Sequence, residues 1–278
     1  MKNIISYVMW GQDGRYHGNI NWTLIANSAI YPEFCSRFYI HKDSMNLPAC
    51  KIVEIASQEF PDLVELEILD LPIVGTQLTA WRMQPLWEGD VGILLCRDLD
   101  HITNIPERES VEQFIRHSDK LIHGIRSYAL HTTAYLAGLV GFKCLDVRTR
   151  IQTLAPTFSR YIAWGQANIE YCSNGWVWGC DQALLRDFFG KAGLYPDTMD
   201  CPQFTAPPYV ADFNAAMVLQ KNYTGINIRE CDMEALAYSN SVAPGFTGAP
   251  CDATTNQFND LTAIVQTDYA KFIKGFYE

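Results

Sequence analysis

The amino-acid sequence predicts an α/β fold with a mainly parallel sheet flanked by helices. Over about the first 100 of its 278 residues, short apolar runs of strand type alternate with runs of helical type. Hydrophobic residues make up 48% of the chain, which is enough for a packed core. One apolar run, at residues 93–97, stops at Asp98 and Asp100, and sheets of this class bind their ligands where the strands end.

The first half of the chain supplies most elements of the expected sheet. Apolar runs predict strands at residues 4–10, 35–41, 63–69 and 93–97. Apolar residues at helical spacing predict helices at residues 21–31, 51–60, 78–87 and 106–117. Pro32 ends the first of these helices, and Pro106 begins the last, which has Glu107 and Glu109 in its first turn.

The second half has a different texture. A helix is predicted at residues 180–189, after a stretch rich in Trp, Gly and Asn. Residues 196–256 are rich in Pro, Thr, Ala, Asn and Gly and predict irregular structure, whereas residues 257–277 predict a closing helix. We therefore expect one domain over residues 1–195 and a loop-rich extension, residues 196–278, that packs on the same domain.

Composition narrows the class of protein. The formal net charge of −10 argues against a dedicated nucleic-acid binder. The nine cysteines include no Cys-X-X-Cys pair, so structural zinc is not expected, and Cys96 and Cys144 lie in apolar runs typical of a core. No run is long enough to be a transmembrane segment, and the N-terminus lacks the features of a signal peptide. Together these features predict a cytoplasmic protein with reduced thiols.

The two acids Asp98 and Asp100 are the first candidate site residues. If this segment is extended, both side chains point to the same side, because side chains alternate along a strand. Two such carboxylates can hold Mg²⁺ or Mn²⁺, and the cation can neutralise a diphosphate. A pair of acids after a strand can equally be a solvated turn or a helix cap, so the pair alone does not decide between these alternatives.

Several further segments occur in a fixed order between residues 4 and 190. They include Val8-Met9-Trp10-Gly11-Gln12-Asp13, Trp81-Arg82, Arg97-Asp98-Leu99-Asp100, His123-Gly124-Ile125-Arg126, Ala137-Gly138-Leu139-Val140-Gly141 and Gly179-Cys180-Asp181-Gln182. In order and spacing they resemble a family of small GT-A-type nucleotide-sugar glycosyltransferases of bacteria and viruses. The resemblance implies a GT-A-like, Rossmann-type sheet over residues 1–195, with the region Ala137 to Gly141 forming a turn beside the sugar.

The sequence departs from this family in two places. The family commonly carries Arg-Asp-His-Pro where this chain has Arg126-Ser127-Tyr128-Ala129, which leaves the donor sugar open. Many metal-dependent relatives also supply a late histidine to the metal, but no histidine follows His131 here. The metal would then be held by Asp98, Asp100, the diphosphate and water, or by a late acid such as Asp252.

The resemblance implies a role for each matching residue. Asp98 and Asp100 would bind Mn²⁺ or Mg²⁺ as the cofactor. Asp181 is the candidate catalytic carboxylate, as a base or as a sugar-binding group, and its alternative is a helix N-cap. Arg97 could pair with a phosphate or form a surface ion pair. Arg82 could hold a phosphate or the carboxylates of Asp98 and Asp100, or it could be a charge on the helix surface. The residues expected to bind the donor are Trp10, Gly11, Gln12, Arg82, Arg97, Asp98, Arg126, Gly138 and Gln182.

These expectations converge on a metal-dependent glycosyltransferase. It would move a sugar from a nucleoside diphosphate sugar donor to a hydroxyl-bearing acceptor, such as a glycan. One alternative is a viral-type DNA glycosyltransferase acting on hydroxymethylated bases, because Arg and Lys residues and aromatic residues occur in the middle of the chain. Another is a non-catalytic carbohydrate-binding protein on a degenerate transferase fold.

Overall fold

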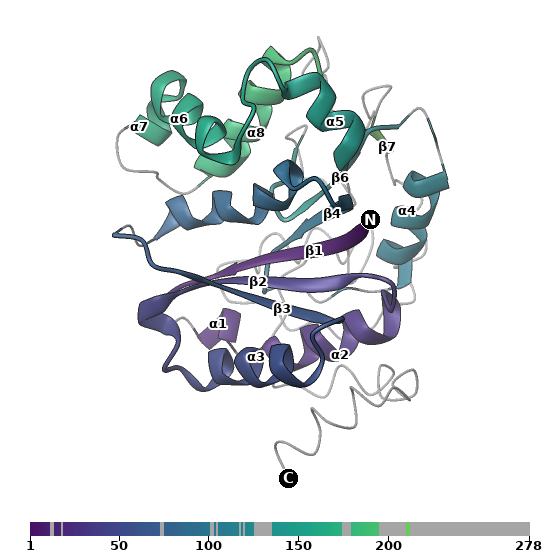
Figure 1. The fold of residues 1–278 in the computed structure, drawn as a ribbon, viewed down its shortest axis with the longest axis vertical. Coiled ribbons are helices and arrows are strands. Elements are labelled where there is room, and N and C mark those ends of the chain that lie inside the picture. The colour runs from purple at the N-terminus through teal and green to yellow at the C-terminus, as the bar shows by residue number, and fades with distance from the viewer. Residues whose placement is uncertain are drawn as a thin grey trace, which may run out of the picture.

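The structure is a computed structural model of the chain (Figure 1). It describes residues 1–11, 14–17, 19–72, 75–100, 103, 105–116, 118, 120–124, 135–173, 179–194 and 210–211. Within this part of the chain, every helix is too short or too polar to cross a membrane.

The described strands form one seven-stranded sheet in the order β3-β2-β1-β4-β6-β5-β7. Parallel pairing joins β3 to β2, β2 to β1, β1 to β4 and β5 to β7, whereas β6 runs antiparallel to both β4 and β5. The strands are β1 Lys2–Met9, β2 Cys35–His41, β3 Val64–Leu69, β4 Val91–Arg97, β5 Ile122–Gly124, β6 Leu139–Lys143 and β7 Val210–Ala211. The predicted α/β class, with a mainly parallel sheet flanked by helices, is confirmed.

Helices cover both faces of this sheet, with α1 to α3 on one side and α5 to α8 on the other (Figure 1). The α-helices are α1 Gly14–His17, α2 Ile20–Ile30, α3 Pro48–Glu59, α4 Ile105–Arg116, α5 Cys144–Ile151, α6 Phe158–Asn168, α7 Glu170–Ser173 and α8 Cys180–Lys191. Two 3₁₀ helices, η1 Lys42–Ser44 and η2 Thr76–Trp87, complete the described elements.

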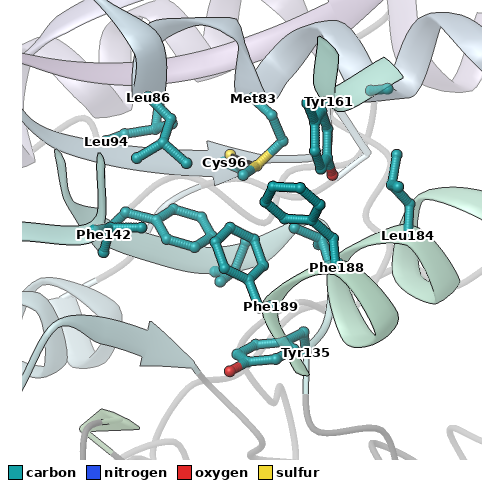
Figure 2. Packing of buried hydrophobic residues seen from close by; sticks show 14 of the residues in the cluster. Met83, Leu86, Leu94, Cys96, Tyr135, Phe142, Tyr161, Leu184, Phe188 and Phe189 are labelled. Atoms are coloured by element: carbon teal, nitrogen blue, oxygen red, sulfur yellow. Dashed lines mark hydrogen bonds between the residues drawn. The ribbon is translucent and has the colours of Figure 1, made fainter. Parts of the chain in front are cut away.

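Each face of the sheet has its own apolar core. On the α2 and α3 side, Tyr7 and Phe38 stack with their ring centroids 5.0 Å apart. On the other side, α8 places Phe188 and Phe189 against the sheet and α6 (Figure 2). Phe189 stacks on Phe142 of β6, with ring centroids 5.2 Å apart. Phe188 packs edge-on against Tyr161 of α6, with ring centroids 4.8 Å apart. This second core fixes α8 relative to β6 and α6, which matters because α8 also carries Asp181.

Most predicted boundaries agree with the structure to within a few residues, and β2 coincides with its predicted range, Cys35–His41. Two predictions were wrong in type. The predicted helix at residues 78–87 is the 3₁₀ helix η2, which contains Pro85, a residue without a backbone donor. The turn expected at residues 137–141 is only two residues long, because the apolar run that follows pairs with β4 as strand β6.

The prediction for the C-terminal part lies almost wholly outside the described residues. Only β7, Val210–Ala211, is described there, and it pairs with β5 inside a region for which irregular structure was expected. The closing helix at residues 257–277 and the domain boundary near residue 195 therefore stay predictions.

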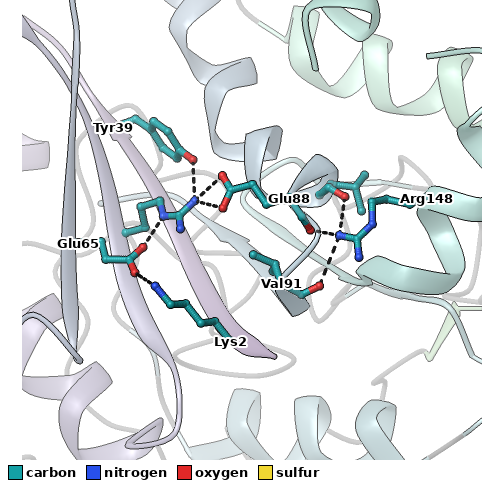
Figure 3. Close-up of polar contacts among 8 residues, drawn as sticks. Lys2, Tyr39, Glu65, Glu88, Val91 and Arg148 are labelled. Atoms are coloured by element: carbon teal, nitrogen blue, oxygen red, sulfur yellow. Dashed lines mark hydrogen bonds and ion pairs between the residues drawn. The ribbon is translucent and has the colours of Figure 1, made fainter. Parts of the chain in front are cut away.

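An arginine network holds the turn that joins η2 to β4 (Figure 3). Arg37 of β2 donates to both carboxylate oxygens of Glu88, at 2.6 and 2.7 Å. Arg148 of α5 donates to the backbone oxygens of Leu86 at 3.2 Å and Val91 at 3.4 Å, and also to that of Glu88. The start of β4 and the end of η2 are therefore held together by charge-assisted bonds from two other elements.

A buried ion pair holds the other end of β4. Arg97 donates from Nε to Glu107 of α4 at 2.7 Å, and both side chains are 0% exposed. Tyr31 donates its hydroxyl to the same carboxylate at 3.2 Å, and Arg97 also donates to the backbone oxygen of Val140 in β6 at 3.2 Å. The pair thus links α4 and β6 to β4 directly before Asp98.

We expect Glu107→Gln to destabilise the fold far more than a matched surface change. The substitution leaves the Arg97 charge buried without its anion, which should cost on the order of 3 kcal/mol of unfolding free energy. Glu112→Gln is the control, because Glu112 lies on the same helix and pairs with Arg108 and Arg116 at a side-chain exposure of 36%. Its cost should stay below about 1 kcal/mol. Urea unfolding measures both, and equal costs would contradict the account.

Candidate functional site

The candidate site lies at the edge of the sheet where its parallel strands end. β1 and β4 are neighbours and parallel, so Trp10 and Gly11 after β1 lie on the same edge as Asp98 and Asp100 after β4. Trp10 is half-buried and packs against the small apolar cluster formed by Tyr39, Leu69 and Leu78. Gly11 is exposed and has a φ of 71°, a left-handed conformation that favours glycine.

Arg82 is the centre of this site. Its side chain is 4% exposed and extends from η2 toward two acids that are distant in sequence. Nη1 donates to Asp98 Oδ1, Nη2 donates to Asp181 Oδ2 at 3.2 Å, and Nε donates to the backbone oxygen of Thr79 at 3.0 Å. Burial acts to lower the pKa of Arg82, but the two carboxylates outweigh it, so this pKa lies above its ordinary value. The guanidinium therefore stays charged and joins the end of β4 to α8.

Asp98 occupies the open side of this arrangement, with 46% of its side chain exposed. Its carboxylate lies against the backbone of Gly138. A Cβ added to Gly138 would come within 2.0 Å of Asp98 Oδ2, so only glycine leaves room for the carboxylate as it stands. The chain turns at residues 99–100, so the two acids do not lie on one extended strand as predicted. The turn begins just beyond Arg97, the last residue of β4 that pairs with β6.

Asp181 lies in the first turn of α8, with 15% of its side chain exposed. The N-cap of this helix is Gly179, with a φ of 84°, so the alternative that Asp181 is itself the cap was wrong. Its Oδ1 accepts the backbone N–H of Gln182 at 2.9 Å. Burial raises the pKa of Asp181 above its ordinary value, Arg82 acts to lower it, and Asp98 acts to raise it. A partly buried carboxylate with a raised pKa beside an open edge is suited to accepting a proton.

Of the remaining predicted residues, the structure describes Arg97 and Gln182 but not Gln12 or Arg126. Arg97 points into the interior, where it pairs with Glu107, so it forms neither a surface ion pair nor part of the exposed edge. Gln182 follows Asp181 in α8 and is half-buried. Gln12 and Arg126 lie outside the described residues, as does His131.

Sequence reasoning missed two neighbours of Asp181. Thr79 and Tyr161 line the same small recess as Arg82, Ala137 and Asp181. Thr79 hydrogen-bonds Asp181 and acts to lower its pKa. It precedes Arg82 by three residues, so helical spacing could have placed both on one face. Tyr161 comes from α6, and its position depends on tertiary packing, which no local sequence motif predicts.

A metal at this edge would need ligands from outside the described protein groups. Among the described residues, no three side chains of His, Cys, Asp or Glu lie close enough together to bind an ion. Two carboxylates can still suit Mg²⁺ or Mn²⁺, because such ions are usually held by one or two carboxylates, substrate phosphates and water. The half-exposed carboxylate of Asp98 and the nearby Asp100 fit this pattern of oxygen ligands.

Comparisons with known proteins give structural likenesses alone, and the one described here is distant. The sequence matches no protein-family model and no curated protein. Among solved structures, it is similar to the mannosyltransferase PcManGT from Pyrobaculum calidifontis, solved in complex with GDP-Man and Mn²⁺. The two chains share 10% identity with a TM-score of 0.40, and the match covers 99% of this chain and 79% of that chain. A likeness this distant does not assign this chain to a family.

Proposed function

We propose that this chain is a metal-dependent nucleotide-sugar glycosyltransferase. The observation that supports this most is the convergence of Asp98, Arg82 and Asp181 at the ligand-binding edge of an α/β sheet. The two acids lie 16 and 99 residues from Arg82 in the sequence, yet they share its guanidinium. The fold alone would not support the proposal, because the same sheet class hosts many activities.

The charge balance of the edge is suited to a cation and a diphosphate. Arg82 offsets only one of the two carboxylates that it contacts, so these three groups together keep a negative charge. A bare diphosphate would be repelled by this surplus, whereas a divalent cation would be attracted by it. Asp98 and Asp100 would hold Mn²⁺ or Mg²⁺, which supplies Lewis-acid stabilisation of the leaving diphosphate when bound.

The chain's own residues would orient the donor and handle the proton. Arg82 would hold the Asp98 and Asp181 carboxylates in position, since its donors are already directed at them. The exposed backbone at Gly11 and the partly buried Trp10 would border the nucleotide after β1. Asp181 would accept the proton of the acceptor hydroxyl in an inverting reaction or bind sugar hydroxyls in a retaining one. The acceptor class, a glycan or another hydroxyl compound, stays a prediction.

Donor binding gives the direct test of this function. Nucleotide sugars of each base would be screened by thermal shift with Mn²⁺, with Mg²⁺ and with a chelator. A donor at 100 times its dissociation constant should raise the unfolding free energy by about 2.7 kcal/mol, and only with metal present. Release of nucleoside diphosphate in the presence of Mn²⁺ then separates an enzyme from a non-catalytic binding protein. If no nucleotide sugar stabilises the protein, the proposed function is wrong.

We expect Asp100→Ala to abolish metal-dependent donor binding while the fold survives. Asp100 is half-buried in a turn after β4, so it contributes little to either core. The control is Asp90→Ala, because Asp90 is exposed in the turn at the opposite end of the same strand. The measurement is the Mn²⁺-dependent thermal shift with donor, and turnover. Undiminished turnover of Asp100→Ala would refute its role as a metal ligand.

We expect Asp181→Asn to lower turnover by on the order of 100-fold or more, since an amide cannot accept the proton. The melting temperature should change little, because Arg82 keeps Asp98 as its partner. Burial raises the pKa of Asp181, so the acid limb of the wild-type rate profile should lie above the ordinary aspartate range. Turnover should fall as the pH drops through that limb.

Asp187→Asn, on the exposed side of α8, should leave rate and profile unchanged. Equal rates for Asp181→Asn and wild type would leave Asp181 with a structural role.

We expect Gly138→Ala to impair the same activity by displacing Asp98. The new Cβ would overlap Asp98 Oδ2, so the carboxylate must leave its place beside Arg82. A misplacement of about 1 Å at a reacting site can lower rates by on the order of 100-fold. Gly89→Ala is the control, because a Cβ there meets open space. Steady-state rates with Mn²⁺ measure the effect, and wild-type rates for Gly138→Ala would show that the position of Asp98 does not matter.

A further inference from the structure

Two cysteines lie together directly behind the candidate site. Cys172 in the short helix α7 and Cys180 in the first turn of α8 are eight positions apart, and Cys172 Sγ lies 4.0 Å from the backbone oxygen of Cys180. The two thiols also interact with each other through their side chains. Both are free thiols, and they are 2% and 0% exposed. Neither the proposed reaction nor the metal site uses them.

We propose that Cys172 and Cys180 form a redox-active pair that a low-molecular-weight disulfide, such as oxidised glutathione, converts to an intramolecular disulfide. The short separation along the chain keeps the entropy cost of ring closure small. α7 is a helix of only four residues at the outer end of the helical layer, where local opening costs least (Figure 1). Such opening gives the oxidant access to a pair that is otherwise buried.

Cys172 is the attacking thiol, because it lies in the four-residue helix α7, whose opening exposes it first. When Cys172 ionises, the Cys180 S–H can turn from the Thr76 oxygen to the Cys172 sulfur, and this interaction lowers the pKa of Cys172. Burial raises the pKa of Cys50 to about 11 and that of Cys96 to about 12, so these isolated thiols stay protonated. Since the thiolate is the nucleophile, the pair should react before them.

The exchange balances in two steps. The Cys172 thiolate attacks one sulfur of oxidised glutathione, which forms a mixed disulfide and releases one glutathione thiolate that takes up the proton Cys172 had lost. Cys180 then loses its proton and attacks the Cys172 sulfur, which forms the protein disulfide and releases the second glutathione as its thiol. Two protein thiols are oxidised, and one glutathione disulfide is reduced to two thiols.

The disulfide should affect the site because Cys180 contacts it in two ways, through the chain to Asp181 and through a hydrogen bond to η2. Cys180 directly precedes Asp181, and its Sγ donates to the backbone oxygen of Thr76, at the start of η2, at 3.9 Å. η2 carries Arg82, the partner of Asp181. Oxidation removes the S–H donor and redirects the sulfur toward α7, so α8 loses its contact with Thr76 of η2 one residue before Asp181. This consequence for the donor site rests on the proposed function, whereas formation of the disulfide does not.

The chemical test uses the unaltered chain in buffers of defined reduced and oxidised glutathione. Remaining thiols are trapped by alkylation, and peptides are mapped by mass spectrometry. Trypsin leaves both cysteines in one peptide, residues 161–186, which should lose two hydrogens on oxidation. Chymotrypsin cleaves after Trp176 and Trp178, so the two cysteines should then lie in separate peptides that part only on reduction.

We expect this disulfide at glutathione ratios where Cys50 is still fully alkylated. Oxidation of Cys172 and Cys180 only together with Cys50, linkage of either to another cysteine, or persistent mixed disulfides alone would each overturn the proposal. Cys172→Ser should abolish the disulfide, and Cys50→Ser should leave it unchanged.

The second readout is donor affinity of the reduced and oxidised protein with Mn²⁺. We expect oxidation to weaken it by on the order of five-fold or more, reversibly on reduction, and to have no effect in Cys172→Ser. Equal affinities with the disulfide formed would show that the pair does not control the site. A failure of the reduced protein to bind any donor would instead refute the proposed function, while the peptide map would still decide whether the pair exists.

Discussion

The arrangement of the site depends on one buried guanidinium. Arg82 is almost wholly removed from solvent, so its charge must be offset by nearby anions, and Asp98 and Asp181 supply them. These acids come from the sheet edge and from a helix on one face of the sheet. Loss of either carboxylate would leave the guanidinium less well paired, and loss of Arg82 would leave two carboxylates facing each other. Electrostatics therefore couples η2, β4 and α8 at the point where a ligand would bind.

The surrounding scaffold holds β4 at both of its ends and holds α8 against the sheet. Arg37 and Arg148 fix the turn before β4, and the Arg97–Glu107 pair fixes the end of the same strand. The aromatic core around Phe188 and Phe189 holds α8 against β6 and α6 (Figure 2). A strand supported at its start, its end and its face can present Asp98 with little freedom, which is the kind of preorganisation that catalysis requires.

The sequence predicted the elements of the fold well, because each carries local information. The apolar pattern of β2 predicted both of its ends, and Pro32 and Pro106 marked helix boundaries. What could not be predicted depends on contacts distant in sequence. Pairing of Leu139–Lys143 with β4 turned an expected turn into a strand. Arg97 could not be assigned to the interior without knowledge that Glu107 folds back onto it.

In the candidate site, too, the residues could be predicted from local sequence, whereas several of their contacts could not. Asp98, Asp100, Arg82, Gly138 and Asp181 were expected from the sequence, as was a contact of Arg82 with the Asp98 and Asp100 pair. The link from Arg82 to Asp181 and the contact between Gly138 and Asp98 needed the fold. Thr79 and Tyr161 were missed because neither belongs to a motif, although the spacing of Thr79 from Arg82 was a usable signal. The thiol pair was missed for a related reason, since its cysteines lie eight positions apart on different helices.

The most direct test of the central claim is a crystal structure of the protein with Mn²⁺ and a nucleoside diphosphate. The account predicts the nucleotide across the ends of β1 and β4, with the cation between its phosphates and the carboxylates of Asp98 and Asp100, and with Arg82 still joining Asp98 to Asp181. A nucleotide bound only by residues 200–278, or a cation bound away from both acids, would contradict the account.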